Sequence, residues 1–185
     1  PEEIALAKNA YEQAMKYEQS KFYDKALYKL AWSYYRLDRF EDAIEHFKQL
    51  VAYSDRQQAK GEQGSVLRAE AVKYIAVSLA EEDWDLDRKV DDNFGLPRIK
   101  QYLSDGKSYE REIIAKLVGR RQGGNKQGYL LKNSHYDEAV KVLQYALEQY
   151  PKHPKNPTFH KQLILALTKA DQVDQAFEER RKLLD

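Results

Sequence analysis

The chain has 185 residues, of which 42% are hydrophobic and 33% charged, a composition typical of a folded, helix-rich protein rather than a disordered one. Its 31 Lys and Arg residues nearly balance its 30 Asp and Glu residues, so no strongly basic field favours nucleic acid as a partner. The absence of cysteine excludes disulfides and thiolate metal sites, and no apolar run reaches the ~18 residues of a membrane span.

The N-terminal part of the chain reads as helices. Residues 2–20 are expected to form the second helix of a repeat whose first helix is missing, and the start at Pro1 suggests a fragment or a processed form. In residues 24–57, apolar side chains recur at helical spacing on both sides of a short polar break, at Leu27, Leu30, Ala31 and Tyr34, then Ala43, Ile44, Phe47 and Leu50. Helices with so short a connection must pack antiparallel.

Further hairpins are predicted along the rest of the chain. Residues 66–104 fit an irregular hairpin, with Pro97 near the start of its second helix. A hairpin over 108–151 is interrupted by a Gly-rich insertion at 119–128, and a terminal hairpin occupies 157–185. Strand signals are almost absent, so the predicted fold is all-α.

One short pattern occurs three times, at residues 39–51, 135–147 and 172–184. Each copy has a large residue, two polar residues, an alanine and an apolar residue, with the alanines at 43, 139 and 176. Repeated hairpins indicate a solenoid, in which each hairpin covers the apolar face of its neighbour.

These residues resemble the tetratricopeptide repeat (TPR), a 34-residue helix-turn-helix. Residues 24–57 match best, at the large and small apolar positions named above and at Phe40 in the turn, although Asp55 stands where the family usually has Pro. The second match comprises Tyr136, Ala139, Leu143, Ala146 and Pro151. The third comprises Leu163, Leu167, Val173, Ala176 and Leu183, and it departs from the pattern at Ile164 and Arg180. The resemblance implies one right-handed α-solenoid of TPR-like hairpins over residues 1–185.

The resemblance also implies a binding surface. By the TPR pattern, one stripe of the first helix faces a concave groove, and here it holds Lys25, Tyr28, Trp32, Tyr35 and Arg36. Half-exposed aromatics there are expected to bind a partner protein or peptide. The alternative is that a neighbouring helix, drawn from residues 66–80, covers these rings as core. The positions with which some TPR domains grip a terminal carboxylate hold Tyr28, Lys29 and Trp32, so an extended or helical apolar peptide suits this stripe better.

Catalytic and metal motifs are weak. The four histidines, His46, His135, His153 and His160, show no metal-binding spacing, and no nucleophile elbow occurs. In residues 83–93, Asp83, Asp85, Asp87 and Asp91 are spaced like ligands of a calcium loop, but Arg88 and Phe94 replace its Gly and its bidentate Glu. We therefore expect a solvated acidic loop whose Asp side chains cap helix starts, and no metal or cofactor.

The insertion at 119–128 is basic and rich in glycine but lacks a phosphate-loop motif. It is expected to be a flexible connection, with Arg120, Arg121 and Lys126 as a possible second contact for an acidic partner. The chain as a whole is expected to be a protein-interaction scaffold without enzymatic activity or membrane insertion, with further repeats of its own chain as another potential partner. The alternatives are a purely structural spacer or a metal-binding module that uses residues 83–93.

Residues 24–47 also resemble TPR proteins of bacterial envelopes, of the gliding-motility and outer-membrane-assembly type. That resemblance favours the periplasm or cell envelope as the location, with the cytoplasm as the alternative.

Overall fold

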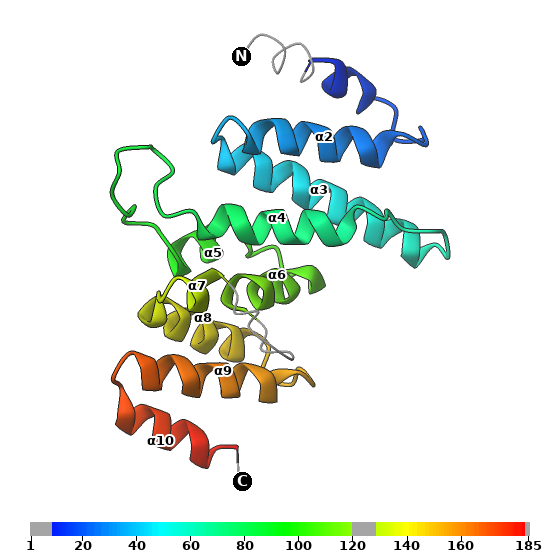
Figure 1. The fold of residues 1–185 in the computed structure, drawn as a ribbon. Helices are drawn as coiled ribbons and strands as arrows, with labels where there is room; N and C mark the ends of the chain where they lie inside the picture. Colours follow the sequence, from blue (N-terminus) through cyan, green and yellow to red (C-terminus); the bar gives the residue numbers. More distant parts are fainter. Residues whose placement is uncertain (1–8, 120–128, 184–185) are drawn as a thin grey trace. The chain divides into compact units, whose positions relative to one another are not determined.

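The computed structural model describes residues 9–119 and 129–183, and it forms helices and turns, with no strand in those two ranges. The chain divides into two compact units, residues 1–91 (unit 1) and 92–185 (unit 2). Figure 1 shows the helices of each unit in chain order. The prediction of an all-α fold built from helix hairpins is confirmed.

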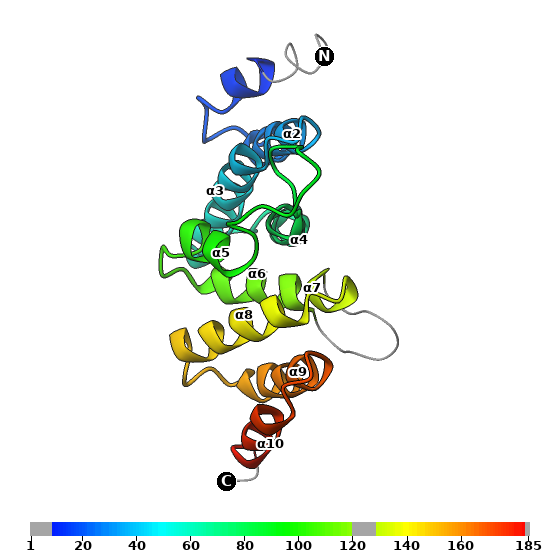
Figure 2. The same cartoon turned by 90° about the vertical axis from the view of Figure 1, so that its left-hand side faces the viewer.

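Unit 1 contains a helical stretch at 9–14 and three longer helices: α2 (Tyr23–Tyr35), α3 (Phe40–Ala59) and α4 (Arg68–Ala80). Helix α3 packs against both α2 and α4 (Figures 1 and 2). The apolar positions read from the sequence form this core, since Leu27, Leu30, Phe47 and Leu50 are fully buried. Ala31 and Ala43 are also fully buried, and their small side chains allow α2 and α3 to approach closely.

Helix α3 is unusually long because its C-terminal part lacks a helix breaker. Asp55 occupies the position where the repeat pattern has Pro, so the helix continues to Ala59. The Asp55 carboxylate instead accepts a hydrogen bond from Nε of Arg68 at 2.5 Å, which ties α3 to the first turn of α4. The chain then turns at Gly61, whose φ of 79° favours glycine.

Unit 2 contains α5 (Leu96–Tyr102), α6 (Ser108–Val118), α7 (Tyr129–Lys132), α8 (Tyr136–Gln149), α9 (Asn156–Lys169) and α10 (Val173–Arg181). Helix α8 packs on α9 and α9 packs on α10, while α6 contacts α7 and α8 (Figure 2). Ala139 and Ala146 on α8 and Ala166 on α9 are fully buried. Closely packed hairpins with small residues at the contacts are therefore common to both units.

Three hairpins share one turn geometry. The residue two positions before α3, α8 and α10 has a positive φ: 56° at Asp38, 65° at Ser134 and 59° at Asp171. The N–H of the next residue donates to a carbonyl five positions earlier, at 3.0 Å for Arg39, 2.9 Å for His135 and 2.9 Å for Gln172. Such left-handed residues satisfy the last carbonyls of a helix as they end it. The repeat is therefore present in the backbone as well as in the alanine positions.

Two predictions concern the chain as a whole. None of the helices within residues 9–119 and 129–183 has the length and apolar character needed to cross a membrane. The helices of the predicted hairpin 66–104 come from both units, α4 from unit 1 and α5 from unit 2. A single superhelical domain over residues 1–185 stays a prediction.

Candidate functional site

The predicted binding stripe lies along α2 of unit 1. Tyr28, Trp32 and Tyr35 are half-buried there, and Lys25 and Arg36 are exposed. Arg36 directly follows the helix but keeps helical backbone angles, with φ −69° and ψ −14°, so it continues the same stripe. The side chains predicted for the stripe are therefore neighbours on one face of one helix.

The three rings of this stripe belong to a larger aromatic cluster, which we define by its members on α2, α3 and α4: Tyr28, Trp32, Tyr35, Phe40, Phe47 and Tyr74. Trp32 stacks on Tyr35 with centroids 5.4 Å apart, and the edge of Tyr74 meets Trp32 at 4.7 Å. Tyr74 also contacts Tyr35 at 5.3 Å and stacks on Phe47 at 5.6 Å. Tyr74 of α4 is therefore the centre of the cluster.

The contacts of the stripe agree in part with the binding interpretation and in part with the packing interpretation. Helix α4 does cover part of Trp32 and Tyr35, as the packing alternative expects, yet neither ring is buried. Among the described residues, nothing accepts a hydrogen bond from the indole N–H of Trp32 or from the hydroxyl of Tyr28. The pKa of Tyr28 is raised by partial burial, and Tyr74 and Glu70 add to the effect. The face thus combines ring surface with two polar tips, those of Trp32 and Tyr28, that have no described partner.

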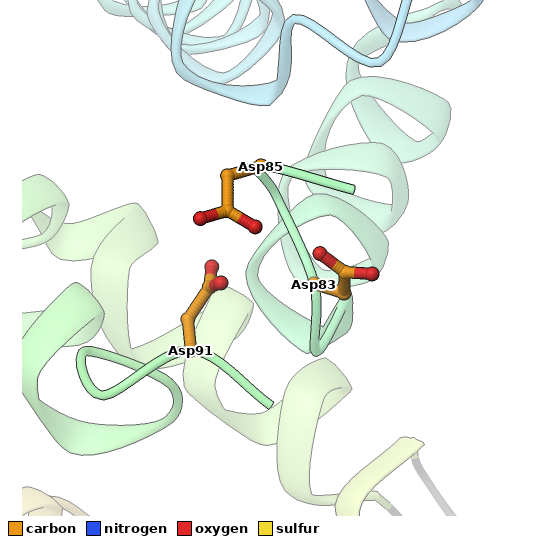
Figure 3. A group of neighbouring side chains, drawn as sticks. All are labelled: Asp83, Asp85 and Asp91. Carbon is orange, nitrogen blue, oxygen red and sulfur yellow. The ribbon is translucent and has the colours of Figure 1, made fainter. Parts of the chain in front are cut away.

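The acidic loop of residues 83–91 brings three of its four predicted carboxylates together. Carboxylate oxygens of Asp83, Asp85 and Asp91 lie within 4.8 Å of one another, and Asp87 is not part of this group (Figure 3). The carboxylate of Asp83 accepts hydrogen bonds from the amides of Asp87 at 3.0 Å and Arg88 at 2.7 Å. Arg88 makes the sharp turn without glycine, at a φ of 69°. The Asp83 carboxylate therefore supports the loop itself, and the residue before α5 is a glycine, so none of these aspartates is its N-cap, contrary to the expectation that they cap helix starts.

Trp84 closes the loop on itself and also fixes it to neighbouring helices. The amide of Trp84 donates to the Asp91 carboxylate at 3.0 Å, and its indole N–H donates to the carbonyl of Ser78 at 3.0 Å. The Trp84 ring lies 5.8 Å from Phe40, next to the aromatic cluster. The loop is therefore anchored by a tryptophan to the end of α4 and the start of α3.

Each histidine has a structural partner. His46 stacks on Tyr34 with centroids 5.1 Å apart, His135 meets Phe94 at 5.1 Å, and Nδ1 of His153 accepts from the amide of Lys155 at 3.1 Å. The pKa of His153 is lowered by burial and by Arg111 and Lys155. His160 pairs with Glu179 across α9 and α10. These contacts place the imidazoles at separate positions along the fold.

The predicted second contact, Arg120, Arg121 and Lys126, lies outside the described residues. Sequence reasoning named the stripe on α2 but missed Tyr74 as an individual residue. The sequence signal for Tyr74 as part of the site is weak, because the α4 segment "RAEAVKYIAVSLA" has the pattern of an aliphatic core helix.

No curated protein matches the chain. Two tetratricopeptide repeat models do match, one over residues 24–56, which spans α2 and most of α3, and one over residues 129–184, which spans α7 to α10. Repeats of this kind are generally protein–protein interaction modules and not catalysts. A stretch of each unit is thus similar to the tetratricopeptide repeat, and the stretch in unit 1 contains the aromatic stripe of α2.

Proposed function

We propose that the chain is a protein-interaction scaffold that binds a partner peptide or helix on the α2 face of unit 1, at Lys25, Tyr28, Trp32, Tyr35 and Arg36. The observation that carries this proposal is the half-exposed state of three neighbouring aromatic rings on one helix face. Tyr and Trp side chains offer large contact area together with a hydrogen-bonding tip, which suits them to binding surfaces.

A displayed library of random peptides, selected against the intact chain, tests the proposal. Selected peptides should bind the wild type and lose at least about tenfold in affinity on Trp32→Ala, as expected for a central aromatic contact. Trp32→Phe keeps a ring against Tyr35 and Tyr74 but removes the indole N–H, so it should fold normally and bind more weakly. Tyr17→Ala is the matched control, because Tyr17 is a 69% exposed aromatic outside the stripe.

A structural spacer is the second candidate, and the contacts of Tyr74 favour it. Under that alternative, Trp32 serves only to pack α4 on α2. Both Trp32 variants would then lower the midpoint of urea unfolding, and no selected peptide would depend on Trp32. These two results together would contradict the scaffold function and support the structural spacer.

For the cellular setting, we propose a place in a bacterial envelope assembly. The support is the resemblance of residues 24–47 to TPR proteins of bacterial envelopes. Fractionation of the source cells with an antibody to this chain would place it with the envelope if the proposal holds. Recovery in the cytoplasmic fraction alone would contradict it.

A further inference from the structure

The α2 face carries two parallel rows of side chains. At about 100° per residue, Lys25, Lys29 and Arg36 fall within about 40° of one another around the helix axis. Tyr28, Trp32 and Tyr35 form the adjacent row, on the side where Tyr74 packs. All three cations are exposed and the three rings are half-buried. A ligand lying along α2 would therefore meet positive charge on one side and aromatic surface on the other.

The charges of the cationic row are not neutralised within the described part of the chain. Neither Lys25, Lys29 nor Arg36 has an ion-pair partner there, and the ammonium of Lys25 lies 5.5 Å from the ring centre of Phe22. Other cations of unit 1 do have partners: Arg39 with Asp42 at 2.7 Å, Arg56 with Glu18 at 2.8 Å, Arg68 with Asp55 at 2.5 Å and Lys73 with Glu70 at 3.3 Å.

Two acidic groups close to this face, Asp24 and Glu70, are engaged in other contacts. The Asp24 carboxylate accepts from the amide of Lys25 at 2.8 Å and from the hydroxyl of Ser65 at 2.6 Å. Glu70, which faces Tyr28, pairs with Lys73. The cationic row thus keeps its positive charge toward solvent, and a carboxylate ligand is complementary to it.

The spacing of one pair of side chains in each row fits an extended chain. Lys25 and Lys29 are four residues apart on the helix, about 6 Å along its axis, and so are Tyr28 and Trp32. Residues i and i+2 of an extended segment are separated by about 6.6 Å and share one side, while the intervening residue points to the opposite side. An extended backbone also has free carbonyls for the Trp32 indole N–H, whereas a helix bonds its carbonyls internally.

Building on the proposed function, we propose that the partner of the α2 face is an extended acidic segment of about six residues in which acidic and apolar side chains alternate. The acidic side chains pair with Lys25, Lys29 and Arg36, and the apolar ones pack on Tyr28, Trp32 and Tyr35. Charge complementarity and the spacing of about 6 Å between Lys25 and Lys29 and between Tyr28 and Trp32 carry the proposal.

Synthetic peptides test this proposal by fluorescence anisotropy with the intact chain. A fluorescein-labelled hexapeptide of alternating Asp and Leu should bind, and added salt should weaken binding. Lys25→Gln, Lys29→Gln and Arg36→Gln should each lower its affinity by up to about fivefold, the upper range for an exposed charge pair. Lys60→Gln, an exposed cation beyond the end of α3, is the matched control and should change nothing.

The outcomes separate this proposal from the function on which it rests. One contrary result is that library peptides require Trp32 for binding and yet lack acidic residues; another is that they bind the three cation variants as tightly as the wild type. Either result would contradict the acidic segment and would leave the proposed scaffold function standing. A preference for Asp residues three or seven positions apart, with none for a spacing of two, would overturn the extended segment, because that spacing is helical. If no peptide of any charge depends on Trp32, both proposals fail.

Discussion

Units 1 and 2 fill the space between their helices with different chemistry. In unit 1, aromatic rings from three helices meet, and the buried polar side chains among its described residues are Ser54 and Ser78. Among the described residues of unit 2, two carboxylates, two guanidinium groups and two amides are buried, at Arg98, Glu110, Arg111, Asn156, Gln162 and Glu179. Rings make contact over broad surfaces in several orientations, whereas buried polar groups need partners at fixed positions. The aromatic rings of unit 1 can therefore contact a ligand as well as one another, whereas the buried polar contacts of unit 2 favour a single packing of its helices.

The polar network of unit 2 is centred on Asn156, at the start of α9. Its Nδ2 donates to the carbonyls of Tyr150 at 2.7 Å and Pro151 at 3.1 Å, and its Oδ1 accepts from Nη2 of Arg111 at 3.2 Å. The Arg111 guanidinium lies 4.1 Å from the ring centre of Phe159, and burial lowers its pKa. Glu110 accepts from the Tyr150 hydroxyl at 3.2 Å. The network therefore joins α6 to the connection between α8 and α9.

The largest predicted effect is at Asn156. Asn156→Ala removes three hydrogen bonds and leaves the buried Arg111 charge without its acceptor, so it should cost about 3 kcal/mol of unfolding free energy. Urea unfolding measures the cost, and hydrogen exchange should show lost protection in α9. Asn133→Ala, at an exposed turn residue, should change stability by less than about 0.5 kcal/mol. Equal costs for the two variants would mean that the polar network contributes nothing to unit 2.

Sequence reasoning found the hairpins because small and large apolar residues recur at helical spacing, and Ala43, Ala139 and Ala176 are buried as that pattern requires. It did not find the network of unit 2, because in "SYEREIIAKLV" the pair Glu110 and Arg111 reads as solvent-facing. Their partners are 40 and 45 residues away, and only the folded chain brings them together.

The same limit applies to the candidate site. Helical spacing placed Tyr28, Trp32 and Tyr35 on one face, since that follows from a single helix. The degree of exposure depends on Tyr74, which comes from another hairpin. Spacing also grouped four aspartates in the acidic loop, but the left-handed turn at Leu86 and Arg88 leaves Asp87 outside the carboxylate group.

A smaller effect is predicted at Tyr150, whose pKa is raised to about 12 by burial and by Glu110. Tyr150→Phe should cost about 1.5 kcal/mol at neutral pH, because it removes a hydrogen bond to a carboxylate. The raised pKa means that the folded state holds its proton more tightly than the unfolded state. This contribution to stability is therefore complete below pH 10 and is lost as the pH rises toward 12.

The pH dependence of stability distinguishes loss of the Tyr150–Glu110 hydrogen bond from a mere loss of packing contacts. Urea midpoints of the wild type should fall between pH 10 and pH 12, and those of Tyr150→Phe should fall less over the same range. Parallel curves for the two proteins would contradict a role for the Tyr150–Glu110 bond.

The smallest predicted effect concerns the left-handed turn that occurs in each unit. It tests whether the two units differ in their turns as well as in the side chains packed between their helices. Asp38 in unit 1 and Ser134 in unit 2 adopt φ values of 56° and 65°, which cost a residue with a Cβ about 1 kcal/mol. Gly at either position relieves this strain but raises the entropy of the unfolded chain, so the net stabilisation should be about 0.5 kcal/mol. Ser134→Gly should gain slightly more than Asp38→Gly, because Asp tolerates the left-handed region better than Ser. Thermal unfolding of the two variants measures the gain. A stabilised unit 2 with a destabilised unit 1 would show that the turns, and not only the buried side chains, distinguish the two units.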